Sequence, residues 1–380
     1  MIRIGIVAGE ASGDLLGSEL ISALKLENAD IKFTGIGGDN MKKAGCDCIY
    51  SIDSLSVMGI SEIFSRYFDL LKIRKNIKNL YLENPPDLFI GIDAPDFNFS
   101  LERMLRQAGI KTLHYVSPSI WAWREYRLKS IARSVDMMLT VFPFEPVLYR
   151  KYGIPVNFVG HPLANKIDLK TDKHIKRQEL GLPEDSKLVA ILPGSRSSEL
   201  KKLTIPFLQT ASLCHKQVGQ LHFICNLVRE DDKKYVESLA RQLTPDIDIT
   251  FYTGRSLDVM GAADVVLLAS GTAALEAMLL KRPMVVAYKV SWLTYQLAKR
   301  LIYLPYVSLP NVLAGRKIVP EYLQDQCTPD NMSKEIIRLF ENKKMVEELE
   351  SEFTRIHENI RPPSDNTIAK IILGLINENR

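Results

Sequence analysis

The chain has 380 residues, of which 46% are hydrophobic and 25% charged, and its formal net charge at pH 7 is +4. This composition excludes a disordered chain, and the length suits two α/β domains of ordinary size better than one. So mild a basic excess does not by itself indicate nucleic-acid binding. The sequence contains no run of 18 or more apolar residues, the length that spanning a bilayer requires. The five scattered cysteines are expected to be reduced thiols.

In the first half of the chain, short apolar runs alternate with segments of helical length. The runs cover residues 2–8, 32–36, 87–92, 111–116, 137–142 and 156–160. Such continuous runs are typical of parallel strands that are buried on both faces, and the segments between them are long enough to be crossover helices. We expect the first run to be a strand rather than a secretory signal, which would need a basic start and a longer apolar stretch.

The second half restarts the same pattern, with apolar runs at 188–192, 221–225, 247–252, 264–269 and 283–288. The sequence therefore predicts an α/β protein with two Rossmann-like, doubly wound domains facing a cleft. The expected divisions are a first domain at 1–165, a charged linker at 166–184, a second domain at 185–345 and a helical tail at 346–380. In such folds, ligands bind beyond the carboxyl ends of the strands.

The strongest local signal follows the run 264–269, where Ser270-Gly271-Thr272 leads directly into a helix. The amino end of a helix offers free backbone N–H groups and a partial positive charge, which suit a diphosphate. Glu276, one turn further on, could accept both hydroxyls of a ribose. The alternative is an ordinary helix cap followed by a solvated acid.

Two other strand ends carry polar groups. Gly194-Ser195-Arg196 offers a serine that can cap the next helix and an arginine that can pair a phosphate through two hydrogen bonds, although such turns are common. Asp93 follows a strongly apolar run and could act as a general base. It could instead cap the turn at Pro95, a role that suits Asp96 better.

The first strand leads into Gly9-Glu10-Ala11-Ser12-Gly13-Asp14, which lacks the dinucleotide-binding glycine pattern and has no acidic residue at the end of the next strand. This argues against a dehydrogenase and leaves a glycine-rich cleft wall. The one match to a metal-binding Asp-x-Asp motif, Asp246-Ile-Asp248, precedes a strand and is treated as chance. We therefore expect neither a metal nor a cofactor, with the helix dipole and Arg196 stabilising a leaving group instead.

Segments 60–82 and 292–306 mix aromatic and aliphatic residues with lysines and arginines. Basic amphipathic helices of this kind suit an anionic membrane surface. The alternative is a pair of helices that face the core and carry solvated basic faces.

Taken together, the motifs resemble those of the lipid-A-disaccharide synthase family, two-domain glycosyltransferases of the GT-B type. No single motif is specific, but together they extend from near residue 5 to near residue 320. The resembling pieces are Val7-Ala-Gly-Glu-Ala-Ser-Gly-Asp14, Val57-Met-Gly-Ile60, Gly91-Ile-Asp-Ala-Pro-Asp-Phe-Asn98, His114-Tyr-Val-Ser-Pro-Ser-Ile-Trp-Ala-Trp-Arg124, Phe158-Val-Gly-His161, Leu192-Pro-Gly-Ser-Arg196, Ser270-Gly-Thr-Ala-Ala-Leu-Glu276 and Tyr306-Val-Ser-Leu-Pro-Asn-Val-Leu-Ala-Gly315.

The resemblance implies that UDP-2,3-diacylglucosamine is the donor and 2,3-diacylglucosamine 1-phosphate (lipid X) the acceptor. The products would be the β(1→6)-linked disaccharide 1-phosphate and UDP, with inversion at the donor carbon. It also implies peripheral attachment to the cytoplasmic leaflet of a Gram-negative inner membrane, and it leaves a homodimer open. The last helix is expected to return to the first domain.

The resemblance also implies roles for individual residues. Asp93 would take the proton from the acceptor 6-hydroxyl, and Glu276 would hold the ribose. The remaining expected contacts fall into two groups: on the donor side Gly194, Ser195, Arg196, Ser270, Gly271, Thr272 and Asn311, and on the acceptor side Gly9, Glu10, Ser12, Gly13, Asp14 and Ser119.

Two other functions stay open at this point. One is a related glycosyltransferase or epimerase that acts on UDP-N-acetylglucosamine without acyl chains. The other is a nucleotide-sugar-binding or membrane-adaptor protein without catalysis, in which removal of the Asp93 carboxylate would leave function intact.

Overall fold

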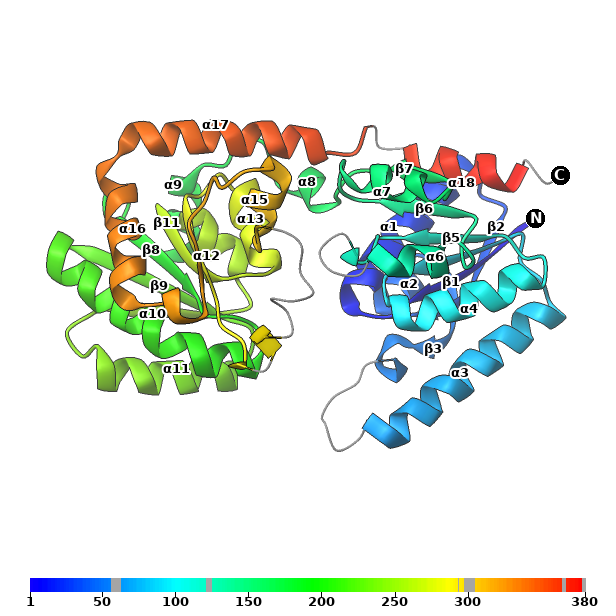
Figure 1. Ribbon diagram of the computed structural model, residues 1–380, viewed down its shortest axis with the longest axis horizontal. Helices are drawn as coiled ribbons and strands as arrows, with labels where there is room; N and C mark the ends of the chain where they lie inside the picture. Colours follow the sequence, from blue (N-terminus) through cyan, green and yellow to red (C-terminus); the bar gives the residue numbers. More distant parts are fainter. Residues whose placement is uncertain (56–62, 121–124, 293, 297–304, 364–366, 378–380) are drawn as a thin grey trace. The chain divides into compact units, whose positions relative to one another are not determined.

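The computed structural model describes residues 1–55, 63–120, 125–292, 294–296, 305–363 and 367–377, with the side chains of 63–67 and 125 excepted (Figure 1). The chain forms two compact units. Unit 1 comprises Met1–Pro162 and Pro362–Arg380, and unit 2 comprises Leu163–Arg361. Among the described residues, no helix combines the length and apolar character that crossing a bilayer requires.

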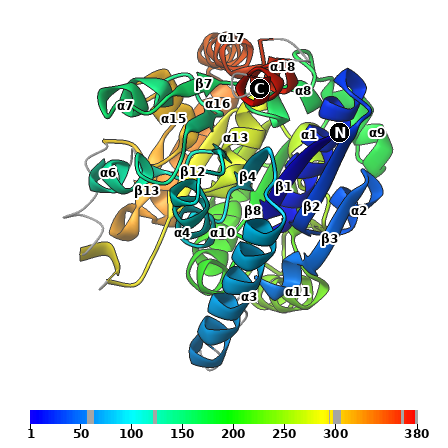
Figure 2. The same ribbon diagram turned by 90° about the vertical axis from the view of Figure 1, so that its right-hand side faces the viewer.

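Unit 1 is built on a seven-stranded parallel sheet with the order β3-β2-β1-β4-β5-β6-β7, of which Figure 2 shows β3, β2, β1 and β4 side by side. The strand order reverses between β1 and β4, so these two strands flank the switch point at which ligands of such sheets bind. The strands are β1 (Ile2–Ala8), β2 (Ile31–Gly37), β3 (Cys46–Ser51), β4 (Leu88–Ile92), β5 (Thr112–Tyr115), β6 (Met137–Thr140) and β7 (Val156–Phe158).

The helices of unit 1 come from both ends of the chain. Helix α18 packs against α1, and the Lys111 Nζ donates a hydrogen bond to the Leu375 carbonyl at 3.0 Å, so the last helix shares a unit with the first strand (Figure 1). The helices are α1 (Ala11–Glu27), α2 (Asp39–Lys43), α3 (Ile63–Glu83), α4 (Pro95–Gln107), α6 (Leu128–Ile131), α7 (Glu145–Lys151) and α18 (Thr367–Asn377), with 3-10 turns η1 (Ile52–Ser54) and η3 (Glu125–Arg127).

Unit 2 is built on a six-stranded parallel sheet with the order β10-β9-β8-β11-β12-β13. Its order reverses between β8 and β11, which again creates a switch point. The two parallel, Rossmann-like sheets confirm the predicted fold class. The strands are β8 (Lys187–Leu192), β9 (Leu221–Leu227), β10 (Ile249–Thr253), β11 (Val265–Ala269), β12 (Met284–Tyr288) and β13 (Glu321–Leu323).

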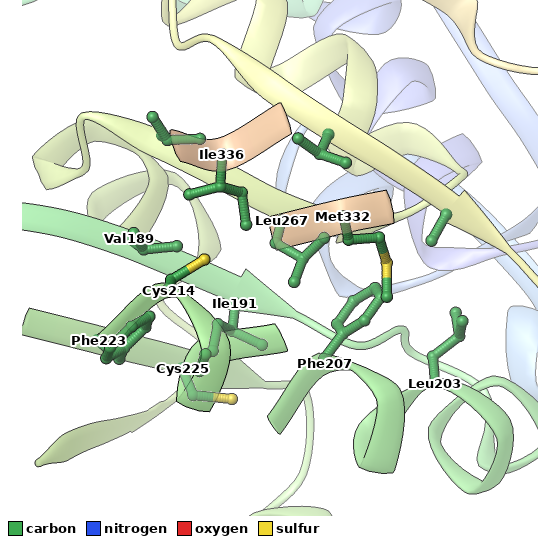
Figure 3. Packing of buried hydrophobic residues seen from close by; sticks show 14 of the residues in the cluster. Val189, Ile191, Leu203, Phe207, Cys214, Phe223, Cys225, Leu267, Met332 and Ile336 are labelled. Atoms are coloured by element: carbon green, nitrogen blue, oxygen red, sulfur yellow. The ribbon is translucent and has the colours of Figure 1, made fainter. Parts of the chain in front are cut away.

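One core of unit 2 lies between the sheet and helices α10 and α16. Phe207 of α10 lies beside Met332 of α16, and Ile336 of the same helix belongs to the same cluster as Leu267 of the central strand β11 (Figure 3). Burial of these side chains fixes the strands whose carboxyl ends carry the site. The helices are α8 (Leu163–Lys166), α9 (Lys173–Leu180), α10 (Ser197–Val218), α11 (Glu230–Leu243), α12 (Ser256–Ala262), α13 (Thr272–Leu279), α15 (Leu309–Ala314), α16 (Pro329–Glu341) and α17 (Lys343–Ile360), with a 3-10 turn η4 (Gln324–Gln326).

The charged segment 166–184, expected as a linker, contains α9 and forms part of unit 2. Arg177 is buried there: its Nε donates to the Ala262 carbonyl at 2.9 Å and its Nη2 to the Asp264 carboxylate at 2.8 Å. A buried arginine is stable when its donors are satisfied in this way. The composition of the segment shows only that Arg177 is charged, whereas Ala262 and Asp264, which accept these two hydrogen bonds, lie more than 80 positions away.

Candidate functional site

A pocket of about 310 Å³ opens at the carboxyl edge of the unit-2 sheet, where the loops after β8, β9 and β11 meet. Seven of the eight residues that the sequence predicts as donor contacts line it, and all come from the switch point between β8 and β11. These residues are Gly194, Ser195, Arg196, Ser270, Gly271, Thr272 and Glu276.

The amino end of α13 forms one wall of this pocket. Gly271 is the N-cap residue, and among the described residues no side chain caps the helix or accepts a hydrogen bond from its first amide groups. A Cβ added to Gly271 would meet no atom within 4 Å, which means that the backbone stands open toward the pocket. Open amides together with the helix dipole make this wall suitable for an anion.

The opposite wall carries Arg196, whose side chain is 76% exposed. Its Nη1 lies 3.1 Å from Oε1 of Glu199, while the other oxygen of that carboxylate accepts hydrogen bonds from the Ser195 and Arg196 amides at 3.1 and 3.3 Å. A carboxylate therefore occupies a nest of donors of the kind that phosphates use. Glu199 was missed by the sequence prediction, although an acidic residue three positions after a helix start is a recognisable capping signal.

Glu276 lies half-buried on the same pocket wall, one turn into α13. Burial raises the pKa of its carboxyl above the ordinary value. Among the described residues, no hydrogen bond or ion pair engages this carboxylate, so its oxygens are available to a ligand with hydroxyl donors. Asn226 at the end of β9 also lines the pocket and accepts a hydrogen bond from the Arg255 amide at 2.9 Å. The sequence prediction missed it, although it directly follows the apolar run 221–225.

Asn311, the eighth predicted donor contact, does not line this pocket. It is fully buried, and its Nδ2 donates to the Val319 carbonyl at 3.0 Å and to Glu321 at 2.7 Å. Its Oδ1 accepts hydrogen bonds from the Ile318 and Val319 amides at 2.7 and 2.9 Å. Since an asparagine side chain has two donors and two acceptor positions, none is left for a ligand. The residue holds the segment after α15 against β13.

In unit 1, Asp93 lies directly after β4 at the switch point. Asp93 and Ala94 both adopt left-handed backbone angles, with φ of 52° and 44°. Such a conformation costs a non-glycine residue about 1–2 kcal/mol, and strain of this kind accumulates at functional sites. The Asp93 side chain is half-buried, and among the described residues no hydrogen bond or ion pair engages its carboxylate. Its backbone amide donates to the Tyr115 carbonyl at 3.0 Å.

The glycine-rich loop after β1 touches this turn. A Cβ added to Gly9 would lie 2.2 Å from the Ala94 Cβ, so the two loops can approach only because position 9 is glycine. Glu10, the N-cap residue of α1, and Ser12 in its first turn are exposed, and Gly13 is buried against the end of β4. The loop thus lies next to the Asp93 turn.

Asp14, in the first turn of α1, has other partners. It is buried, and its carboxylate accepts hydrogen bonds from the amides of Gly38, Asn40 and Met41 at 2.6, 3.1 and 3.1 Å. These contacts hold the start of α2 against α1. Ser119 is exposed in the segment after β5. The adjacent tryptophans of the sequence pattern, at 121 and 123, lie outside the described residues.

These arrangements have distinct chemical capacities. The unit-2 pocket joins open amides, an arginine and a free carboxylate, which together suit a phosphorylated ribose. The unit-1 turn presents a carboxylate on a fixed backbone, which suits proton transfer. Among the residues that the structure covers, no group of three or more His, Cys, Asp or Glu side chains is arranged to hold a metal ion.

Comparison with known proteins gives results consistent with these capacities. A family model described as Lipid-A-disaccharide synthetase matches residues 4–372. The chain is 46% identical over 377 residues to the lipid-A-disaccharide synthase of Vibrio vulnificus (strain YJ016), with 99% of this chain and 98% of that protein covered. It is equally 46% identical over 377 residues to the synthase of Methylobacillus flagellatus, with 99% of this chain and 100% of that protein covered.

Solved structures resemble the chain at the level of fold. A UDP-N-acetylglucosamine 2-epimerase from Listeria monocytogenes superposes with a TM-score of 0.64 at 12% identity, covering 100% of this chain and 96% of that one. The UDP-GlcNAc 2-epimerase of Neisseria meningitidis, bound to UDP-GlcNAc, gives 0.63 at 13% identity with both chains fully covered. The glycotransferase of kitacinnamycin gives 0.63 at 16%, with 98% of each chain covered. At such low identity these likenesses concern the fold alone.

Proposed function

Because the chain belongs to the lipid-A-disaccharide synthase family and is therefore a glycosyltransferase of lipid A biosynthesis, we propose that its unit-2 pocket holds the UDP end of the donor and that Asp93 of unit 1 is the general base. The family reaction joins UDP-2,3-diacylglucosamine to lipid X. The observation that carries the proposal is the uncapped amino end of α13, which shares one pocket with Arg196 and the free Glu276 carboxylate.

In the donor half of the proposal, the diphosphate lies against the amides of Gly271 and Thr272 and pairs with Arg196. Negative charge grows on the UDP oxygen as its bond to the sugar breaks, and oriented amides and a guanidinium stabilise that charge. The incoming diphosphate competes with Glu199 for Arg196 and for the amides of the same turn. Glu199 thus keeps these donors satisfied until the substrate arrives.

Glu276 accepts hydrogen bonds from the two ribose hydroxyls. Its half-burial and the lack of a partner among the described residues support this role, since an ionised carboxylate offers two oxygens to two donors at neighbouring positions. Asn311 supports the fold of unit 2 rather than touching the donor, because its hydrogen-bonding groups are already used. We therefore leave it out of the proposed donor contacts.

In the acceptor half, Asp93 takes the proton of the lipid X 6-hydroxyl while that oxygen forms its bond to the donor carbon. The bond from the same carbon to the UDP oxygen breaks in the same step, and its electron pair leaves with UDP. A single displacement of this kind inverts the configuration, which accounts for a β linkage made from an α-linked donor. Gly9, Glu10, Ser12 and Ser119 are proposed to face the acceptor, because the first three lie in the loop that touches the Asp93 turn or in the helix turn directly after it.

Turnover with defined substrates tests this proposal. Purified protein is incubated with UDP-2,3-diacylglucosamine and lipid X, and mass spectrometry follows the products. We expect the disaccharide 1-phosphate and one equivalent of UDP, and no product when UDP-N-acetylglucosamine replaces the acylated donor. Transfer or epimerisation of the unacylated sugar at a comparable rate would instead favour the related enzymes on non-acylated substrates.

A membrane-facing surface on α3 completes the proposal, because both substrates carry acyl chains. Phe68, Leu71, Lys72 and Lys75 are exposed at helical spacing along one side of α3, with Phe68 68% exposed, while the opposite side packs into the core of unit 1. Apolar and basic side chains on one face suit an anionic interface. We propose peripheral attachment through this face to the cytoplasmic leaflet of the inner membrane, which vesicle binding tests.

Other expected features depend on residues that the structure does not cover. The start of the first amphipathic segment, 60–62, lies outside the described residues, as does most of the second, at 293 and 297–304. Trp292 itself is 73% exposed. A homodimer stays a prediction, and light scattering of the purified protein is the measurement that decides it.

A further inference from the structure

Asn98, three residues into α4, contacts the backbone of the Asp93 turn with its side chain. We propose that Asn98 is the positioning residue of the catalytic aspartate: its amide group holds the left-handed turn after β4 and thereby aims the Asp93 carboxylate. This inference rests on the proposed role of Asp93 as the base. Nothing in it requires Asn98 to touch either substrate.

The contacts of Asn98 span the switch point of the unit-1 sheet. Its Nδ2 lies 2.8 Å from the Asp93 carbonyl oxygen, 3.3 Å from that of Ile92 and 3.4 Å from that of Val7. Two of these carbonyls belong to the ends of β1 and β4, the strands between which the sheet order reverses. One buried NH2 group therefore ties both strand ends to the turn, with its shortest contact to Asp93.

The Asp93 carbonyl is the backbone group of the turn that depends on the Asn98 side chain. The Asp93 amide donates to the Tyr115 carbonyl, and the Ala94 carbonyl accepts from the amides at the start of α4. Among the described residues, the Asp93 carbonyl has the Asn98 side chain as its partner. Two consecutive non-glycine residues at positive φ are costly, and such a conformation persists only where its surroundings hold it.

The Asn98 side chain is itself held in place. A Cβ added to Gly91 would lie 3.0 Å from the Asn98 Cβ and 2.2 Å from Oε1 of Glu102, one turn further along α4, so both side chains fill the space that glycine leaves. Glu102 is bonded to Nδ1 of His114 at 2.7 Å, and the His114 ring stacks on Phe99 at 4.3 Å between centroids. Asn98, Glu102 and His114 are all fully buried.

One atom of Asn98 argues against a purely structural role. Among the described residues, its Oδ1 is buried without a hydrogen-bond partner. An unsatisfied buried oxygen is unfavourable, and an apolar side chain of the same shape would avoid it. An apolar residue, however, has no NH2 group to donate to the Asp93 turn, and this donor is what asparagine supplies at position 98.

The turn sets the direction in which the Asp93 side chain points. The φ angle of a residue sets where its Cβ points, so relaxation of Asp93 to an ordinary negative φ would swing the carboxylate to another side of the strand end. A misplacement of about 1 Å in a reacting group can lower a rate by about 10²-fold. Loss of the Asn98 donor should therefore lower kcat far more than it changes substrate binding.

Two variants of Asn98 test the proposal. Asn98→Leu keeps the shape and removes the donors, and Asn98→Ala removes the side chain. We expect kcat to fall by about 10²-fold in both, with the KM of each substrate and the calorimetric affinity for UDP within about threefold of wild type. The matched control is Thr112→Val, also fully buried in unit 1, which loses a hydrogen bond to the Ser134 carbonyl at the other end of β5. It should lower the Tm and leave kcat unchanged.

A double-mutant cycle separates positioning from stability. With Asp93→Asn already present there is no basic carboxylate to aim, so adding Asn98→Leu should cause no further loss of the residual rate. Any of three results would overturn the positioning role. The first is the same fold-loss of rate from Asn98→Leu in both backgrounds, and the second is a kcat within about threefold of wild type in both Asn98 variants. The third is unfolding of both Asn98 variants at a temperature where Thr112→Val stays folded. Wild-type activity in Asp93→Asn alone would instead refute the proposed base, and the inference with it.

Discussion

Two junctions of the same kind, β4 to α4 in unit 1 and β11 to α13 in unit 2, lie next to the switch points of their sheets and are built in opposite ways. At the first, two residues that carry side chains adopt left-handed angles, and a proline starts the helix. At the second, small residues lead in and Gly271 is extended, with φ of 165°. The first junction presents a side chain, and the second presents backbone amides.

The difference shows how one fold position can serve two kinds of chemistry. A carboxylate that removes a proton must point in one direction, and a strained turn held by a buried side chain gives it that direction. A diphosphate needs several donors at once and close access to the backbone, which short side chains and an uncapped helix end allow. The comparison predicts that changes at the first junction alter the rate of reaction, while changes at the second alter nucleotide affinity.

The largest expected effect comes from Asp93. Asp93→Asn keeps the size of the side chain and removes its basicity, so kcat should fall by about 10²–10⁴-fold, the usual contribution of a general base. The affinity for UDP, measured by calorimetry, should be unchanged because the nucleotide pocket lies within unit 2. Steady-state turnover of both acylated substrates is the measurement.

The matched control for this variant is Asp96→Asn, three residues further on. Asp96 is an exposed acid whose carboxylate pairs with Arg127 at 2.6 Å, and its loss should leave kcat within about twofold of wild type. If Asp96→Asn were inactive and Asp93→Asn active, Asp96 rather than Asp93 would be the general base, and the strained backbone at Asp93 would play no part in catalysis.

A smaller effect is expected at Glu276. Glu276→Gln should weaken UDP binding by about tenfold, because hydrogen bonds to a charged acceptor contribute roughly 1.5–3 kcal/mol. Burial raises the pKa of this carboxyl, and only the ionised form accepts from both hydroxyls. UDP affinity should therefore fall as the pH is lowered, beginning at a higher pH than for an exposed glutamate.

Calorimetry of wild type and variant between about pH 7.5 and 5 checks this prediction, since the titration window lies above the usual range of a glutamate. The difference between the two proteins cancels the titration of UDP itself. Glu237→Gln on α11, where Glu237 pairs weakly with Lys233, is the control and should bind UDP as wild type does. Parallel pH profiles for wild type and Glu276→Gln would contradict a ribose contact.

The smallest expected effect concerns the exposed side of α3. Removal of one charge in Lys72→Gln should weaken binding to anionic vesicles by about fivefold at low salt, since each basic residue near such a surface contributes about 1 kcal/mol. The same charge change in unit 2, Lys343→Gln on α17, is the control, because this side chain is 90% exposed. Equal loss of binding in the two proteins, judged by sedimentation with the vesicles, would mean that net charge and not α3 governs attachment.

The strands could be predicted from the sequence because a parallel strand that is buried on both faces is a continuous run of apolar residues, as in β11. The residues at their carboxyl ends could be proposed for the same reason, and so Arg196, Thr272 and Glu276 were expected near one ligand. What local pattern cannot show is which polar group is already occupied. Asp14 and Asn311 look available in sequence, but backbone and side-chain groups of other segments already hydrogen-bond to each of them.

Asn98 illustrates the reverse case. In sequence it is one polar residue in the first turn of a helix, with nothing to set it apart from a solvated position. Its partners include the Val7 carbonyl, 91 positions away, and the turn at residues 93 and 94. Both residues of this turn have left-handed backbone angles, which aspartate and alanine at these positions do not indicate. Such roles arise from tertiary contacts, which local pattern does not encode.

The return of α18 to unit 1 has a consequence for synthesis on the ribosome. Ala369, Ile372, Leu375 and Ile376 of this helix are buried, yet they are translated only after the whole of unit 2. The nascent N-terminal sheet must therefore wait with part of its apolar surface uncovered while the 199 residues of unit 2 (Leu163–Arg361) are translated. During that interval the exposed surface is open to chaperones and to aggregation, so completion of unit 1 is timed by the last helix to leave the exit tunnel.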